Sequence, residues 1–161
     1  MRKHGRLLRS LVLVLALAPQ AGAVDDEPLP LPAAPESSTL SIEPERRFNE
    51  GLALAKTRDW RGAETAYRDA LRGKPTLAEA WNGLGYALRN QGKYEESLRA
   101  YYEALRLRPD YPEALEYLGE AYVQMGRLDE ARRLLERLRQ MNAPEADDLA
   151  RAITGAAGRT R

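Results

Sequence analysis

The stretch Ala78–Tyr111, AEAWNGLGYALRNQGKYEESLRAYYEALRLRPDY, contains two amphipathic helical patterns separated by a short break. Apolar residues recur at intervals of three and four, as one face of a helix requires. In the two halves these residues are Ala80, Leu84, Ala87 and Leu88, then Leu98, Tyr101, Ala104 and Leu105. Asn90–Gly92 interrupts the first pattern, and Pro109 ends the second because proline cannot extend a helix. The stretch therefore predicts a helical hairpin, with helices over 78–90 and 94–107.

The same pattern recurs at a spacing of 34 residues on both sides of this hairpin. The recurring small, large and turn-forming positions are Gly51, Ala63, Tyr67, Ala70, Pro75, Trp81, Leu84, Gly85, Ser97, Tyr101, Ala104, Pro109, Gly119, Tyr122 and Ala131. A lone hairpin cannot bury its apolar face, whereas about three stacked copies share a continuous core. We therefore expect three repeats, over 44–77, 78–111 and 112–145. The helices of the first repeat are predicted over 44–57 and 60–73, and those of the third repeat over 112–125 and 128–140.

The recurring glycine indicates where two helices approach each other closely. Glycine inside a helix costs about 1 kcal/mol relative to alanine, so three such placements imply a steric requirement. Because Gly85 lacks a Cβ, we expect the facing helix to come close and to bury Tyr101 there. The sequence Gly83-Leu84-Gly85 is then a packing feature inside a helix rather than a phosphate-binding loop.

These positions resemble the tetratricopeptide repeat pattern W-x-x-L-G-x-x-Y…A-x-x-x-F…A…P. The middle copy carries it as Trp81, Leu84, Gly85, Leu88, Ser97, Tyr101, Ala104 and Pro109. The resemblance covers 44–145 and departs from the pattern at the ends, where Arg47, Glu50, Leu138 and Ala143 replace motif residues. It implies an all-α fold, a right-handed α-solenoid of three helix-turn-helix units. Outer faces of terminal repeats meet solvent, which is where such departures are expected.

The N-terminal segment 1–23 has the organisation of a secretory signal peptide. Four basic residues precede the apolar run Leu11–Ala18, and Ala21-Gly22-Ala23 offers small residues for cleavage. The alternative is an uncleaved anchor, but a membrane span needs roughly 20 apolar residues. We therefore expect an exported, soluble product in the periplasm or outside the cell, with membrane contact only through the signal peptide before its removal.

Two further segments flank the repeats. Residues 24–43 are rich in proline, serine and acidic residues, and we expect a disordered or extended linker there. Its Leu-Pro-Leu-Pro stretch could alternatively dock as a polyproline peptide. Beyond the repeats, 146–161 is predicted to form a short capping helix and a frayed tail. Pro144 suits the first turn of that helix, and Leu149 and Ile153 would cover the end of the third repeat.

Composition excludes several kinds of chemistry. The chain has no cysteine, and its one histidine, His4, lies in the signal segment, so no His- or Cys-based metal or nucleophile site is expected. We expect no cofactor, no metal and no enzyme activity, with a carboxylate-based envelope hydrolase as a remote alternative. Lys and Arg number 25 against 24 acids; without the signal they number 21. With no basic run, nucleic acid is not an expected partner.

The family resemblance implies that a ligand would bind the concave surface formed by the first helix of each repeat. The residues carried onto that surface are Glu45, Phe48, Leu52, Lys56, Glu79, Asn82, Tyr86, Arg89, Asn90, Glu113, Glu116, Glu120, Val123 and Gln124. The family's Lys/Arg/Asn clamp for a C-terminal carboxylate is absent, because its places hold Phe48, Leu52, Gly83, Glu113 and Tyr117. A chaperone-tail adaptor is therefore disfavoured.

The uneven chemistry of this surface suggests the kind of ligand. Phe48 and Leu52 form an apolar pair at one end, whereas Glu113, Glu116 and Glu120 share one helix face at the other. We therefore expect a non-enzymatic scaffold or adaptor in an envelope or secretion assembly. Its partner would be a peptide or protein with an apolar anchor and basic residues. A self-associating structural domain is the alternative, and in a third arrangement the linker folds back onto the apolar pair.

Overall fold

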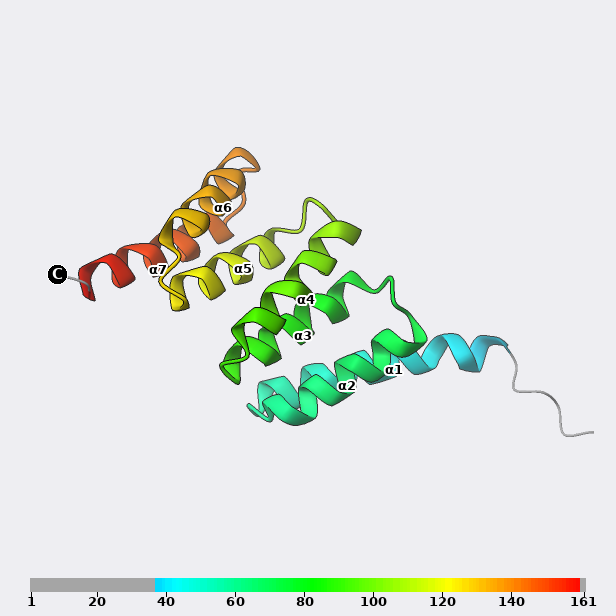
Figure 1. Ribbon diagram of the computed structural model, residues 1–161. Coiled ribbons are helices and arrows are strands. Elements are labelled where there is room, and N and C mark those ends of the chain that lie inside the picture. The colour runs from blue at the N-terminus through cyan, green and yellow to red at the C-terminus, as the bar shows by residue number, and fades with distance from the viewer. Residues whose placement is uncertain (1–36, 160–161) are drawn as a thin grey trace, which may run out of the picture. The chain divides into compact units, whose positions relative to one another are not determined.

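The computed structural model of the chain describes residues 37–159, with side chains over 43–158. Every regular element in this part is an α-helix: α1 Ser37–Lys56, α2 Trp60–Gly73, α3 Ala78–Asn90, α4 Tyr94–Leu107, α5 Pro112–Gln124, α6 Leu128–Gln140 and α7 Glu145–Arg159. Successive helices form hairpins, α1 with α2, α3 with α4 and α5 with α6, followed by α7 (Figure 1). The prediction of an all-α solenoid of helical hairpins is confirmed. The predicted signal peptide, 1–23, lies outside the described residues.

The bounds of most helices agree with the expected ones. Helices α2, α3, α4 and α6 match residue for residue, and α5 ends one residue earlier, at Gln124. The turns of the second and third hairpins contain Gly92 and Gly126 in the left-handed region, with φ of 76° and 74°. In the first hairpin Arg58 adopts this conformation with φ of 61°, although a side chain makes it unfavourable. No helix in the described part is both long and apolar enough to cross a membrane.

Helix α1 begins earlier than the sequence indicated. Residues 37–43, which we assigned to the linker, are helical, so that prediction is wrong for them; 24–36 lie outside the described residues. The Glu43 carboxylate accepts hydrogen bonds from Arg46 and Arg47, three and four residues on, a spacing that supports helix. Pro44 is buried against the end of α2, where a Cβ on Gly73 would lie 2.7 Å from its Cγ. Proline therefore marks a packing contact inside α1, not its start.

Helix α7 is longer than the predicted cap. It runs to Arg159, so residues 154–159 are helical and the prediction of a frayed tail is wrong for them. The Thr154 hydroxyl donates to the Ala150 carbonyl at 2.9 Å, as in a continuing helix. Leu149 is fully buried and Ile153 is 7% exposed, and both pack into the core of the third repeat. The expected covering of that end is therefore present, on both α5 and α6.

The glycine contacts follow the expected geometry. A Cβ on Gly85 would lie 2.6 Å from the Tyr101 ring, and one on Gly51 would lie 2.6 Å from the Tyr67 ring. The third glycine differs: a Cβ on Gly119 would meet Leu149 of α7 at 2.5 Å. The steric reason for glycine is thus confirmed in the first two repeats, and the cap takes the corresponding space in the third.

The buried side chains form two main clusters. The first joins repeat 1 to α3 around Tyr67, Leu84 and Leu88. The second joins α4, repeat 3 and α7 around Tyr101 and Leu115. A smaller group of buried residues, Ala78, Ala104, Tyr111 and Ala114, lies where repeat 2 meets repeat 3. Each cluster is therefore made largely by neighbouring helices, as repeat stacking requires.

Candidate functional site

Side chains of α1, α2, α3 and α5, together with Tyr111, enclose a hollow of about 380 Å³, which we call the groove. Its lining residues are Phe48, Leu52, Ala55, Lys56, Tyr67, Glu79, Asn82, Gly83, Tyr86, Tyr111 and Tyr117. Both α1 and α5 contact α3, so the first helices of the three repeats lie next to one another there. The groove thus lies where these three helices meet.

Aromatic rings form much of the groove wall. Phe48 packs against Tyr67 with ring centroids 5.9 Å apart, and Tyr86 packs against Tyr117 at 5.2 Å. Leu52 stays 39% exposed, one of two large hydrophobic residues in the described part with an exposed side chain. These groups offer an apolar surface on which another side chain can bury area, and such burial is favourable by about 25 cal/mol per Å².

Asn82 places a polar group in this apolar surrounding. The residue is 7% exposed, and its Nδ2 donates to the Tyr111 hydroxyl at 3.4 Å. Its Oδ1 is buried and has no hydrogen-bond partner in the described part of the chain. A buried acceptor without a partner typically lowers stability by about 1–3 kcal/mol, so a ligand that donates a hydrogen bond to the Asn82 Oδ1 would be favoured.

An ion pair between Arg89 and Glu120 makes the charge pattern differ from the predicted one. The Arg89 guanidinium lies over the rings of Tyr86 and Tyr117, 5.3 and 5.6 Å from their centroids. It is 7% exposed and forms an ion pair with Glu120 across the α3–α5 boundary. The sequence predicts an acidic stripe of Glu113, Glu116 and Glu120 that no basic residue of the same helix neutralises, and α5 indeed contains no Lys or Arg. The base that pairs with Glu120 comes from the adjacent repeat, so the three acids do not form a stripe without a counter-charge.

Glu116 differs from the other members of the expected stripe. It is only 9% exposed, and no described residue forms a hydrogen bond or ion pair with its carboxyl. Burial, with the negative charges of Glu120 and Glu145, raises the pKa of Glu116 to about 7. Glu113 alone is exposed to solvent. The three acids therefore occupy three different environments instead of forming one solvated stripe.

The remaining nominated residues divide between the groove and its surroundings. Six of the fourteen line it: Phe48, Leu52, Lys56, Glu79, Asn82 and Tyr86. Glu45 instead pairs with Lys74 at 2.7 Å, and Val123 packs against the second core cluster. Asn90 and Gln124 are exposed, and the Asn90 Nδ2 donates to the Tyr86 carbonyl at 2.8 Å.

Five lining residues were not among the fourteen nominated ones, although two of them, Gly83 and Tyr117, occupy places of the family's carboxylate clamp. The five are Ala55, Tyr67, Gly83, Tyr111 and Tyr117. Gly83 and Tyr117 occupy equivalent repeat positions, 34 residues apart, which is a signal that the sequence already contained. Tyr67 could not have been found in this way, because its ring passes from α2 past Gly51 and Gly83 to reach the groove.

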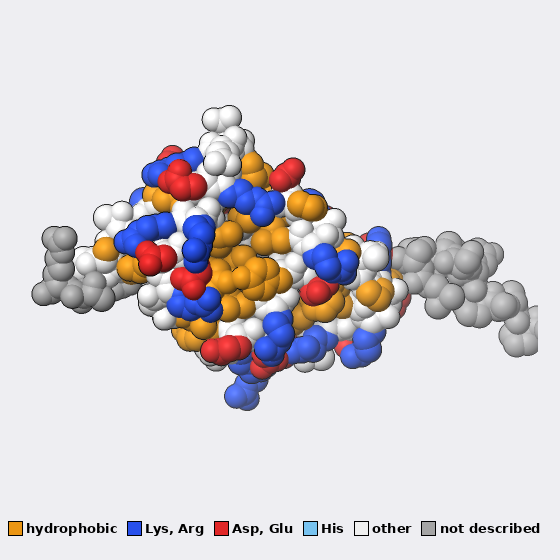
Figure 2. Space-filling view, turned by 45° about the horizontal axis from the view of Figure 1, so that its top comes forward, with side chains coloured by type: hydrophobic (Ala, Val, Ile, Leu, Met, Phe, Trp, Pro, Cys, Tyr) orange, Lys and Arg blue, Asp and Glu red, His pale blue; other side chains and the backbone are white. Residues whose placement is uncertain are grey.

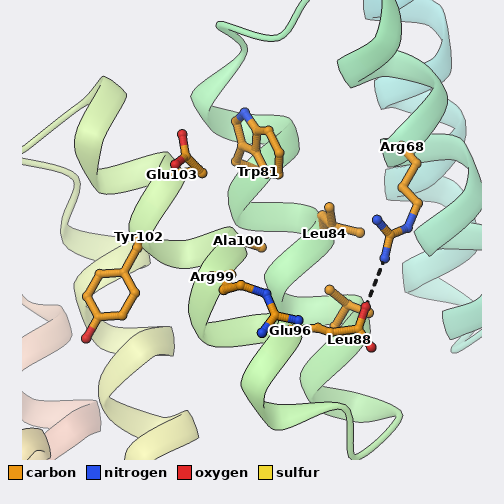
Figure 3. A pocket seen from close by; sticks show the side chains of 9 residues that line it. All are labelled: Arg68, Trp81, Leu84, Leu88, Glu96, Arg99, Ala100, Tyr102 and Glu103. Atoms are coloured by element: carbon orange, nitrogen blue, oxygen red, sulfur yellow. Dashed lines mark hydrogen bonds and ion pairs between the residues drawn. The ribbon is translucent and has the colours of Figure 1, made fainter.

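A second hollow, of about 550 Å³, lies between α2 and α4 over α3. Its lining residues are Arg68, Trp81, Leu84, Leu88, Glu96, Arg99, Ala100, Tyr102 and Glu103. Figure 3 shows Arg68 and Glu96 joined across it by an ion pair of 3.3 Å. Figure 2 shows one face of the whole molecule, on which hydrophobic side chains gather among charged ones. Leu84 and Leu88 are only 2% and 1% exposed, however, so the floor of this hollow offers little apolar surface.

Consecutive helical hairpins whose first helices line a groove define a helical-repeat protein. Three family models match the chain: a TPR repeat over 85–126, and tetratricopeptide repeats over 66–99 and 113–142. Residues 66–142 therefore belong to the tetratricopeptide repeat family, as the sequence resemblance predicted. A search of curated proteins finds no significant match.

Solved structures share this fold at low sequence identity. The TPR2B-domain:pHsp70 complex of yeast Sti1 is similar with a TM-score of 0.67 at 18% identity, covering 73% of this chain and 98% of that one. The first TPR of Spaghetti (RPAP3), bound to the HSP90 peptide SRMEEVD, is similar with a TM-score of 0.65 at 22% sequence identity. The similarity covers 73% of this chain and 95% of that one. SycD, a type III secretion translocator chaperone of Yersinia enterocolitica, is similar with a TM-score of 0.63 at 18% sequence identity. The similarity covers 71% of this chain and 89% of that one. These similarities establish the fold.

Proposed function

We propose that this chain is a non-enzymatic interaction scaffold that binds an extended peptide, or a segment of a partner protein, in the groove. The observation that carries the proposal is the combination of an aromatic wall with the buried Asn82 Oδ1, which has no partner in the described part. A backbone or side-chain N–H of a ligand would supply the missing donor. Leu52 would meanwhile lose its contact with water against an apolar ligand side chain.

The chemistry of the groove limits the choice of ligand. Two of the similar structures are an Hsp70 complex and a domain bound to an HSP90 peptide, so this fold can hold such partners. In this chain Phe48, Leu52 and Gly83 stand where the family's carboxylate clamp requires polar or basic residues. An acidic tail would find few partners on this wall. An apolar anchor at the α1 end of the groove suits it better.

We further propose that the chain works after export, in the periplasm or outside the cell, within an envelope or secretion assembly. The motivation is the sequence 1–23, in which a basic segment, a short apolar run and a small-residue site follow one another. The ligand would then belong to another envelope or secreted protein.

Peptide selection tests the groove directly. Phage-displayed random peptides are selected on the wild-type chain, and their affinities are then measured by fluorescence anisotropy. We expect the selected peptides to share an apolar residue. Leu52→Ala should weaken their binding about tenfold, which corresponds to about 1.4 kcal/mol. Tyr102→Ala is the matched control, because Tyr102 is the other exposed large hydrophobic residue and lines the α2–α4 hollow.

Two results would contradict the proposal. If Tyr102→Ala weakens the peptides and Leu52→Ala does not, the α2–α4 hollow is the binding surface. If no peptide is enriched and light scattering shows that the chain associates with itself, a self-associating structural domain becomes the better explanation.

A further inference from the structure

One residue of each repeat occupies an equivalent position on the first helix, and two of these three residues line the groove. Phe48, Asn82 and Glu116 follow one another at the 34-residue spacing of the repeats. The first two line the groove, and so does Tyr117, the residue next to Glu116 on α5. The chemistry at this position thus changes from an aromatic ring to an amide to a carboxyl from the first repeat to the third, and the carboxyl lies next in sequence to a groove residue, Tyr117.

The carboxyl at this position of the third repeat has no cation of its own. Glu116 is more than nine-tenths buried, yet no hydrogen bond or ion pair reaches its carboxyl from any described residue. Arg89 is the positive charge that acts on it, but the Arg89 guanidinium is paired with Glu120. Burying a carboxylate without a partner is costly, so this position is suited to receive a positive group from outside.

A second carboxyl reaches the same place from the cap. Glu145 lies in the first turn of α7, and its negative charge acts on Glu116. The Glu145 Oε2 is buried and has no hydrogen-bond partner among the described residues. Ala146 and Leu149, both buried against the core of the third repeat, hold this turn of α7 beside α5. Leu149 of α7 packs on Gly119 of α5, and Glu145 and Glu116 each precede this contact by about one helical turn, so both carboxyls lie at the same end of the α5–α7 contact. Neither carboxyl has a hydrogen-bond partner in the described part of the chain.

We propose that Glu116 and Glu145 form a subsite for one lysine or arginine side chain of the segment bound in the groove, so that α7 completes the binding site. This inference rests on the proposed function for its biological ligand. A guanidinium or ammonium group can donate to both carboxyls at once, which matches two acceptors without donors. The described residues contain no cluster of three or more acidic or histidine side chains that could hold a metal ion, which favours an organic cation.

The charges around the subsite make binding depend on pH. Glu116 faces Glu113 and Glu120 of its own helix, Glu145 of α7 and Arg89 of α3. Its pKa of about 7 means that an arriving cation displaces a proton at and below neutral pH. Affinity for the cation should therefore fall as pH decreases, by about thirtyfold between pH 8 and pH 5.5.

A small cation tests the subsite without any peptide. Nα-acetylarginine methylamide is titrated into the full chain, and the glutamate carboxyl carbons are followed by ¹³C NMR. We expect the Glu116 resonance to shift in a saturable way and its apparent pKa to fall when the probe is present. The neutral norleucine analogue should have no effect. Glu116→Gln and Glu145→Gln should each weaken probe binding at least tenfold, whereas Glu95→Gln, on an exposed part of α4, should leave it unchanged.

Peptides selected on the groove provide the second readout. Replacing their lysine or arginine by norleucine should cost at least tenfold in wild-type affinity and little in Glu116→Gln. If the arginine probe produces no saturable shift at Glu116, or binds Glu116→Gln equally well, the subsite does not exist. If peptides bind but none depends on a basic residue, the inference fails and the groove function stands. If the probe binds and no peptide does, the cation subsite stands and the peptide-binding function fails.

Discussion

The buried carboxyl of Glu116 predicts an unusual dependence of stability on pH. Its pKa rises from an ordinary 4.5 to about 7 in the folded chain, because of burial and the charges of Glu120 and Glu145. The native state therefore holds this proton more tightly than the unfolded state does. The resulting stabilisation is fully present below about pH 4.5 and is lost as pH rises through 7. A pKa difference of this size corresponds to about 3 kcal/mol in the free energy of unfolding, and about 2 kcal/mol of this stabilisation is lost between pH 5.5 and pH 8.

Urea denaturation followed by circular dichroism at these two pH values measures the effect. The wild type should be more stable at the lower pH by about 2 kcal/mol, and Glu116→Gln should remove most of this difference because its amide does not titrate. Glu130, whose pKa is lowered by Arg127, titrates below this window and does not interfere. Glu95→Gln should keep the wild-type dependence. Equal pH dependence in the wild type and Glu116→Gln would refute the assignment of a raised pKa to this carboxyl.

Three further predictions concern packing and processing. Gly85→Ala should lower the free energy of unfolding by about 1–3 kcal/mol, because the added Cβ would lie 2.6 Å from the fully buried ring of Tyr101. Gly155→Ala is the control and should not destabilise the chain, because no atom of another described segment lies within 4 Å of its added Cβ. Equal losses for the two variants in urea melts would contradict the reasoning. Leu149→Ala should cost about 2–5 kcal/mol, since that side chain is fully buried; a loss below 1 kcal/mol would mean that α7 is loosely attached. Intact mass of the chain from an envelope fraction should show cleavage after Ala23, and a full-length product would contradict a cleaved signal.

The helix bounds could be predicted because their signals are local. Gly92 provides the left-handed turn residue of the middle hairpin, and Pro109 follows the end of α4, so both can be recognised from a few neighbouring residues. The start of α1 could not be found in this way. Pro44 fits the first turn of a helix as well as it fits its actual position inside α1, where its ring packs on the end of α2. That contact is tertiary and leaves no mark in the local pattern.

The site was only partly predictable, because its electrostatics depend on how the repeats meet. Repeat position nominated Phe48, Leu52 and Asn82, and these three residues line the groove. It could not show that Arg89 pairs with Glu120, since these residues are 31 positions apart and meet only when α3 packs on α5. The raised pKa of Glu116 likewise depends in part on the charge of Glu145, which lies on α7. An acidic helix face in a sequence therefore does not establish an acidic surface in the fold.

The division of the core into two clusters affects how the chain resists opening. Phe48 and Tyr67 belong with the first cluster, whereas Tyr117 packs against the second, yet all three line the groove. In a stack of repeats, such halves can open separately, each with its own free energy. An occupant spanning the groove would contact both halves, so that neither could open without releasing it. Hydrogen exchange in the halves would then slow together, and two local unfolding events would become one cooperative transition.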